Sequence, residues 1–139
     1  MTESTNPAIA ALVLRVSLGT MFIAHALLKY FVFTLPGTAE FFVSLGLPGA
    51  LGYATFAAEL VGGVLLLLGV KTRVVALALV PILLGATWVH AGNGWLFTAP
   101  NGGWEYPAFW TITLVVQALL GDGAYALRPS QHEPAGLPA

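Results

Sequence analysis

A small set of ionisable side chains lies inside long apolar stretches of this sequence. Glu59 interrupts the otherwise uncharged run 49–70, while His25 and Lys29 belong to an earlier run. His90 belongs to a later one. A carboxylate inside a bilayer costs about 2.5–3.5 kcal/mol on insertion scales, so Glu59 needs a charged partner or a function. Because histidine exchanges protons near neutral pH, these residues predict proton handling or ligand binding within a membrane.

The composition places the chain in a membrane. Of its 139 residues 58% are hydrophobic and only 8% are charged, whereas soluble domains carry about 25% charged residues. The formal net charge is −1, which gives no case for a nucleic-acid partner because no basic patch neutralises phosphates. Cysteine is absent, which excludes disulfides, dithiol redox chemistry, iron–sulfur ligation and c-type haem attachment.

The apolar stretches predict an all-α, integral membrane four-helix bundle. Each is close to the roughly 20 helical residues that cross a bilayer, and they cover approximately 8–33, 49–70, 73–96 and 106–127. The fourth is the weakest, because Asp122 leaves only 106–121 uncharged. A short apolar piece around 41–45, flanked by Gly- and Pro-containing turns, is expected to be an interfacial helix. Pro81 is expected to kink the third span.

The expected organisation is a single domain with short ends. Residues 1–7 form a cytoplasmic N-terminus, 8–127 the four-span domain, and 128–139 a polar, Pro-containing tail expected to be disordered. An even number of spans places both termini and the basic turn 71–73 on one side. By the positive-inside rule that side is cytoplasmic. The chain is thus expected to be a multi-pass plasma-membrane protein.

The orientation converts sequence position into depth. At 1.5 Å per residue, Glu59 is expected near the midplane of the membrane. The residues expected in the outer half of the bundle are His25, Lys29, His90, Asn93 and Glu105. Spacings of 3, 4, 3 and 4 place one set of residues on a single face of the first helix: Arg15, Leu18, Phe22, His25 and Lys29. Polar groups in such helices face the bundle interior. Glu59 shares a face with Gly62 and Gly63, which permit close helix approach.

These residues support more than one interpretation. Glu59 is either an ion-pair partner of Arg15 or Lys29 that fixes helix register, or a proton acceptor or ligand-binding carboxylate. The two histidines are either proton donors to a redox ligand or axial ligands of a haem b. A dinuclear metal site from His25, Glu59, His90 and Glu105 is a further alternative, although the Glu-x-x-His motif is missing.

Aromatic residues gather at the same outer depth. Their simplest interpretation is an interfacial belt, formed by Trp95, Trp104, Tyr106 and Trp110. A flat ligand such as a quinone headgroup could also stack among them.

Several short segments lie in order through most of the chain: 14–19, 25–29, 46–48, 59–69 with Thr72-Arg73, 90–94, 105–107 and 121–123. In their order and spacing they resemble the DoxX family of small four-span membrane proteins, and the Glu59-Leu-Val-Gly-Gly segment is the most specific. The resemblance implies a four-helix membrane fold and an association with redox systems. Some members are subunits of thiosulfate:quinone oxidoreductases, and others resemble membrane partners of soluble redox enzymes.

The leading hypothesis is a quinone bound in the outer half of the bundle, as part of an oxidoreductase system. His25 and His90 hydrogen-bond the quinone oxygens and exchange protons, and Glu59 relays a proton or balances charge. Lys29 or Arg15 keeps Glu59 ionised, and Asn93 and Glu105 complete the rim. Electrons come from a partner protein or a larger membrane complex.

The rival hypothesis is a non-catalytic membrane anchor or assembly partner of a redox enzyme complex. Its buried charges would be structural only. A transporter is the third possibility, but four spans without repeats provide little machinery for alternating access.

Overall fold

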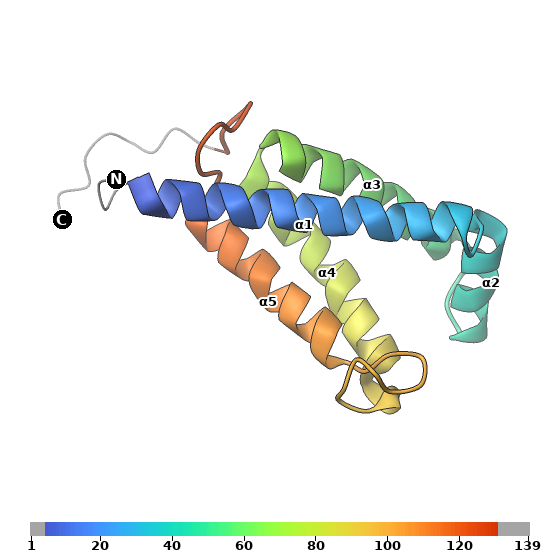
Figure 1. Ribbon diagram of the computed structural model, residues 1–139. Coiled ribbons are helices and arrows are strands. Elements are labelled where there is room, and N and C mark those ends of the chain that lie inside the picture. The colour runs from blue at the N-terminus through green and yellow to red at the C-terminus, as the bar shows by residue number, and fades with distance from the viewer. Residues whose placement is uncertain (1–4, 131–139) are drawn as a thin grey trace.

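The computed structural model describes residues 5–130, and these are almost entirely helical (Figure 1). Within this part of the chain the elements are α1 (Thr5–Phe31), α2 (Leu35–Ser44), α3 (Ala50–Leu68), α4 (Thr72–His90), the short 3₁₀ helix η1 (Ala91–Asn93) and α5 (Glu105–Leu120). A single isolated bridge joins Val70 and Arg128. The predicted all-α membrane bundle is confirmed, with α1, α3, α4 and α5 as its long helices.

Three of the helices have the length and apolar composition needed to cross a membrane. They are α1, α3 and α4 continued through η1. The helix α5 has 16 residues, about 24 Å at 1.5 Å per residue, and it ends seven residues before the expected limit at Leu127. It stops there because Gly121 adopts φ 85°, a conformation that L-residues disfavour.

The remaining boundaries differ from the sequence pattern in two places. The helix α2 is longer than the expected piece around 41–45, because the hydroxyl of Thr34 accepts a hydrogen bond from the Gly37 N–H (3.2 Å) and caps its start. The helix α4 continues through Pro81, as expected for the third span, but it ends at His90 and passes into η1, before the expected limit at Leu96. Residues 1–4 and 131–139, including most of the tail expected to be disordered, lie outside the described residues.

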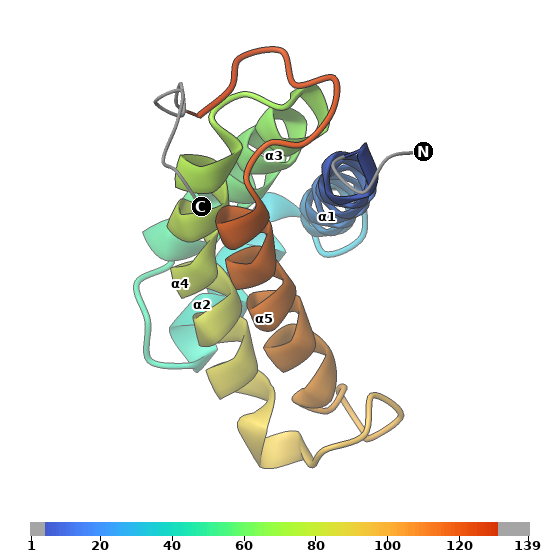
Figure 2. The same ribbon diagram turned by 90° about the vertical axis from the view of Figure 1, so that its left-hand side faces the viewer.

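The long helices form two antiparallel pairs that splay apart. α1 packs along α3, and α4 packs along α5. Figures 1 and 2 show the two pairs meeting near the start of α1 and diverging toward α2 on one side and the 91–104 segment on the other. We call the first region the terminal end; it holds the start of α1, the turn 69–71 and the segment 121–130. The opposite region, with the end of α1, the start of α3 and residues 86–106, is the loop end.

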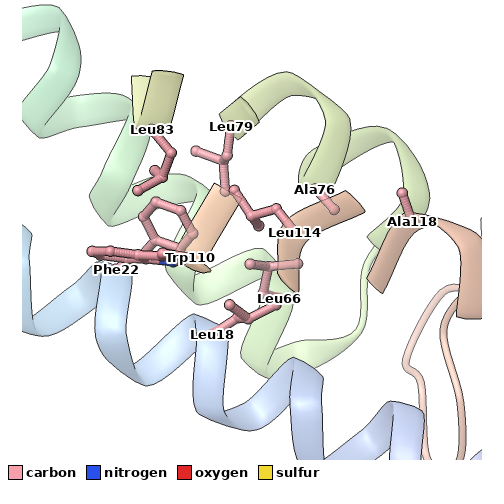
Figure 3. Packing of buried hydrophobic residues seen from close by; sticks show 9 residues of the cluster. All are labelled: Leu18, Phe22, Leu66, Ala76, Leu79, Leu83, Trp110, Leu114 and Ala118. Atoms are coloured by element: carbon pink, nitrogen blue, oxygen red, sulfur yellow. The ribbon is translucent and has the colours of Figure 1, made fainter. Parts of the chain in front are cut away.

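A hydrophobic core joins both pairs. It contains Leu18 and Phe22 of α1, Leu66 of α3, Ala76, Leu79 and Leu83 of α4, and Trp110, Leu114 and Ala118 of α5 (Figure 3). The rings of Phe22 and Trp110 lie 4.6 Å apart at the contact between the pairs. This core positions α5 against the inner face of α1.

Glycines bring α1 and α3 into close contact, as the Glu–Gly–Gly segment predicts. A Cβ added to Gly19 would lie 2.8 Å from the carbonyl oxygen of Gly63, and a Cβ on Gly63 would lie 2.9 Å from that of Gly19. Gly62 faces α4 instead, where a Cβ would meet Leu79 at 2.9 Å. Larger residues would push the helices apart, so these glycines set the spacing around Glu59.

Candidate functional site

Lys29 and Glu59 form an ion pair between α1 and α3. The Lys29 Nζ atom lies 2.9 Å from Oε2 and 3.1 Å from Oε1 of Glu59, and the two side chains are only 18% and 7% exposed. Side chains tilt toward the N-terminus of their own helix, so in this antiparallel pair the two residues lean toward each other. The buried carboxylate therefore has the cationic partner that its position demands.

Arg15, the other candidate partner of Glu59, has a different role. It lies fourteen positions before Lys29, about 21 Å along the helix axis, and is 1% exposed at the terminal end. Its guanidinium donates to the carbonyl oxygens of Leu66, Leu67, Asp122 and Ala124 at 2.9–3.0 Å. The first two belong to the last turn of α3, whose carbonyls lack helical partners. Arg15 thus joins α1 to the end of α3 and to the segment after α5.

His25 lies where α5 meets α1, between the ion pair and two aromatic rings. Its Nδ1 atom is 2.8 Å from the carbonyl oxygen of Met21. The imidazole contacts Trp110 edge-on with ring centroids 4.7 Å apart, and Tyr106 nearly parallel at 6.2 Å. His25 lies one helical turn before Lys29 on the same face of α1. His25 therefore adjoins the ion pair along α1 and packs against α5 on its other side.

His90 lines a cavity of about 300 Å³ at the loop end. The other lining residues are Phe97, Gly102, Gly103 and Tyr106. As in His25, the Nδ1 atom is bound within its own helix, 2.7 Å from the carbonyl oxygen of Ala86. Tyr106 thus contacts His25 and also lines the cavity that contains His90.

Asn93 and Glu105 shape the loop over this cavity and do not reach Glu59. The Asn93 amide donates to the carbonyl oxygen of Gly102 (2.9 Å) and more weakly to that of Asn101 (3.4 Å). The Glu105 carboxylate accepts the backbone N–H of Phe97 at 2.9 Å. Both side chains hold cavity-lining residues in place, so their contacts are with the protein backbone.

The expected single constellation is therefore two neighbouring groups. One contains Lys29, Glu59 and His25, and the other is the cavity with His90. Two residues that connect them, Tyr106 and Trp110, were assigned by sequence to the interfacial belt. Their i, i+4 spacing places them on one face of α5, but Tyr106 is 44% exposed, as the belt assignment expects. Trp110 is in fact core, at 5% exposure, whereas Trp95 and Trp104 pair at 4.4 Å near the surface.

The alternative dinuclear metal site has no ligand cluster. Within residues 5–130, no three His, Asp or Glu side chains gather closely enough to hold a metal ion. Glu59 is engaged by Lys29 and Glu105 by Phe97, which removes two of the four proposed ligands from a common centre.

Asp122 organises the terminal end. Its carboxylate accepts the Thr72 N–H at the start of α4 (3.2 Å) and both the N–H and hydroxyl of Ser130 (2.9 and 3.0 Å). Partial burial acts to raise the pKa of this carboxyl, but the hydrogen bonds from Ser130 and Thr72 together outweigh it and hold the pKa below its ordinary value. The anion also lies at the positive end of the α4 dipole. Asp122 is thus an N-terminal cap for α4 supplied from a distant segment.

The splayed bundle and its buried ion pair define a small helical membrane protein. The chain belongs to the DoxX family: the family model matches residues 10–92, a stretch that includes His25, Lys29, Glu59 and His90. It is also 36% identical over 122 residues to a Bacillus subtilis (strain 168) protein named "Putative oxidoreductase CatD", covering 87% of this chain and 86% of the relative. No solved structure matches the chain significantly. The family resemblance indicated by the sequence motifs is confirmed.

Proposed function

We propose that this protein binds a quinone-type ring at the loop end and serves as a plasma-membrane subunit of an oxidoreductase system. The observation that carries the proposal is the cavity lined by His90 and Tyr106. The Tyr106 ring also stacks with His25, which lies one helical turn before Lys29 of the Lys29–Glu59 pair. The oxidoreductase name of the Bacillus subtilis relative supports the redox part. With both termini in the cytoplasm, the loop end faces the outer leaflet.

The size and lining of the cavity suit a small ring. A volume of about 300 Å³ is at the lower limit of ligand pockets, which favours a one- or two-ring headgroup over a larger cofactor such as haem. Phe97 and Tyr106 provide aromatic surface against which a flat ring can pack. His90 provides the nitrogen that exchanges a proton with a ring oxygen.

The charged group that adjoins His25 balances the proton movements. Oxidation of a quinol releases two protons and two electrons. When His25 takes a proton, the Glu59 carboxylate stabilises the resulting imidazolium, and the Lys29 ammonium, 2.9 Å from Glu59, favours the ionised form of this carboxylate. The electrons pass to a redox partner protein or a larger membrane complex, because the sequence holds no cysteine and no nucleotide-binding motif.

The second candidate function is a non-catalytic anchor for a redox complex. The observation that favours it is the Lys29–Glu59 pair itself, which satisfies both charges within the bundle. Under this alternative the pair only fixes the register of α1 and α3, and replacing both charges together leaves assembly with the partner intact.

The deciding experiment compares activity with folding. The variants are His25→Ala and the double variant Glu59→Gln/Lys29→Met, which removes both charges and leaves neither unpaired. We expect both to insert and to migrate as the wild type on size exclusion, yet to lose quinol oxidation by membranes that contain the complete redox complex. Ser17→Ala is the control, because its hydroxyl bonds only the carbonyl of Val13 on the exposed face of α1. Wild-type turnover in the correctly folded variants would overturn the proposal and favour the anchor.

A visible spectrum and a lipid extract of the purified protein identify the ligand. We expect bound quinone and no Soret band; a Soret band would assign the two histidines to haem.

A further inference from the structure

The hydrogen bonding of His90 determines which of its nitrogens can meet a ligand. A backbone carbonyl oxygen can only accept, so the 2.7 Å contact with Ala86 requires Nδ1 to carry the proton. In the neutral ring Nε2 then holds a lone pair and acts as an acceptor. Among residues 5–130 no hydrogen bond to this Nε2 atom is found, so its accepting capacity is not used by the described protein.

The Nε2 edge of His90 faces the loop that covers the cavity. A Cβ added to Gly102 would lie 3.4 Å from Cδ2 and 3.8 Å from Nε2. Gly102 has φ +82°, and its carbonyl is held by Asn93 (2.9 Å). Gly102 therefore lies beside the Nε2 edge of the ring, and the absence of a side chain at Gly102 leaves space next to that nitrogen.

The other lining groups accept apolar rings and offer no charge. Phe97 and Tyr106 contribute aromatic surface, and Gly102 and Gly103 contribute backbone. The lining residues include no Lys, Arg, Asp or Glu. An anionic ligand would thus lie without a counter-ion. A neutral aromatic ring would lose little free energy of hydration on leaving water.

We infer that the resting cavity selects a neutral ring that carries a hydroxyl donor, a phenol or quinol, through an O–H···Nε2 hydrogen bond to His90. A ring that carries only carbonyl or ether oxygens brings no proton to the Nε2 lone pair and is bound more weakly. This inference rests on the proposed function for the location of the ligand, and it adds that the reduced form is the one recognised. Gly102 is the positioning residue that keeps the Nε2 edge accessible.

The test uses a redox-inert pair of probes on the full chain in detergent: para-cresol and its methyl ether, 4-methylanisole. One hydrogen bond to a ring nitrogen corresponds to about a tenfold difference in affinity. We expect para-cresol to bind about tenfold more tightly and to shift the ¹⁵N signal of His90 Nε2, assigned through His90→Gln, while the ether leaves it unchanged. Equal binding of the two probes, or an unshifted Nε2 signal at saturation, would overturn the inference.

Two glycine variants separate access to His90 from strain in the loop. Gly102→Ala places a methyl group against the His90 ring and is expected to abolish the preference for para-cresol. Gly94→Ala is the matched control, because Gly94 also has a positive φ (+98°) but its added Cβ would meet only Ala99 at 4.0 Å. Loss of the preference in both variants, or in neither, would contradict the assignment of Gly102.

The outcomes also separate this inference from the proposed function. Equal binding of the probes together with His25-dependent quinol oxidation would remove the inference and keep the function. Selective binding of para-cresol, together with turnover that is independent of His25 and Glu59, would keep the inference and remove the proposed function.

Discussion

The two ends of this bundle use their buried polar groups differently. At the terminal end, Arg15 and Asp122 bind backbone groups of several segments. At the loop end, the two helix pairs diverge (Figure 1), and each histidine commits only its Nδ1 atom to the backbone. The contrast teaches that buried polarity in one small bundle can hold the fold together at one end and leave chemical groups accessible at the other.

The difference follows from the position of the helix ends. The terminal end gathers the last turn of α3, the first of α4 and the last of α5, whose backbone groups lack partners within their own helices. Arg15 supplies donors and Asp122 an acceptor for them. At the loop end, the connection 94–104 is held by its own backbone and by the side chains of Asn93 and Glu105, so that the side chains of His25 and His90 are not required for that purpose.

The largest effect is expected from replacing Arg15. Arg15→Leu leaves the carbonyls of Leu67, Asp122 and Ala124 without donors, and leaves that of Leu66 with only the Gly69 N–H. Each carbonyl left without a donor costs about 1–3 kcal/mol. We expect the free energy of unfolding to fall by at least about 3 kcal/mol, measured by chemical unfolding in detergent. Arg15→Lys should recover only part of it, because an ammonium cannot reproduce the guanidinium fork. A wild-type unfolding curve for Arg15→Leu would refute the structural role of this residue.

An intermediate effect is expected from the ion pair. Lys29→Met leaves Glu59 buried and unpaired, and breaking such a pair costs about 3–5 kcal/mol. The double variant Lys29→Met/Glu59→Gln should be less destabilised than the single one, since neither charge remains. The measurement is a double-mutant cycle on the free energy of unfolding, with Ser17→Ala as a reference. Additive losses would show that the two side chains do not interact.

The smallest effect is expected from protonating Asp122. Its pKa in the folded protein is lowered, so the stabilisation is complete above the ordinary pKa of an aspartate and is lost as the pH falls through the lower folded value. Melting temperatures recorded from neutral to acidic pH should therefore show a drop that Asp122→Asn lacks. An identical pH profile for both proteins would exclude Asp122 as the source.

Much of this fold follows from the sequence, because a bilayer restricts the structures that a spanning segment can adopt. The length of each apolar run predicts α1, α3 and α4, and the Glu–Gly–Gly segment predicts the close approach of α1 and α3. The sequence pattern extends the last span to Leu127, which is too far, but the helix-terminus turn that it indicates at Asp122, between Gly121 and Gly123, lies directly after the end of α5 at Leu120.

The site was harder to predict. The depth of a residue in the membrane does not determine which helices are neighbours, or how far the two helix pairs diverge. Lys29 and Arg15 lie on one face, and only the antiparallel register of α1 and α3 decides that Lys29 reaches Glu59. Similarly, Asn93 and Glu105 have the correct depth for a rim, but local backbone groups of the 94–104 loop satisfy them. Trp110 matched an interfacial belt, and its inward position depends on the contact between α1 and α5, whereas Tyr106 remains 44% exposed.

The most direct test of the division between the two ends is the quinone content of three purified proteins. Wild type, His90→Phe and Asp122→Asn are extracted after purification in mild detergent, and quinone and quinol are measured together per mole of folded protein. We predict bound quinone or quinol in the wild type and in Asp122→Asn, and its loss in His90→Phe at unchanged melting temperature. A wild type free of both forms, or equal content in His90→Phe, would contradict a ligand site at the loop end.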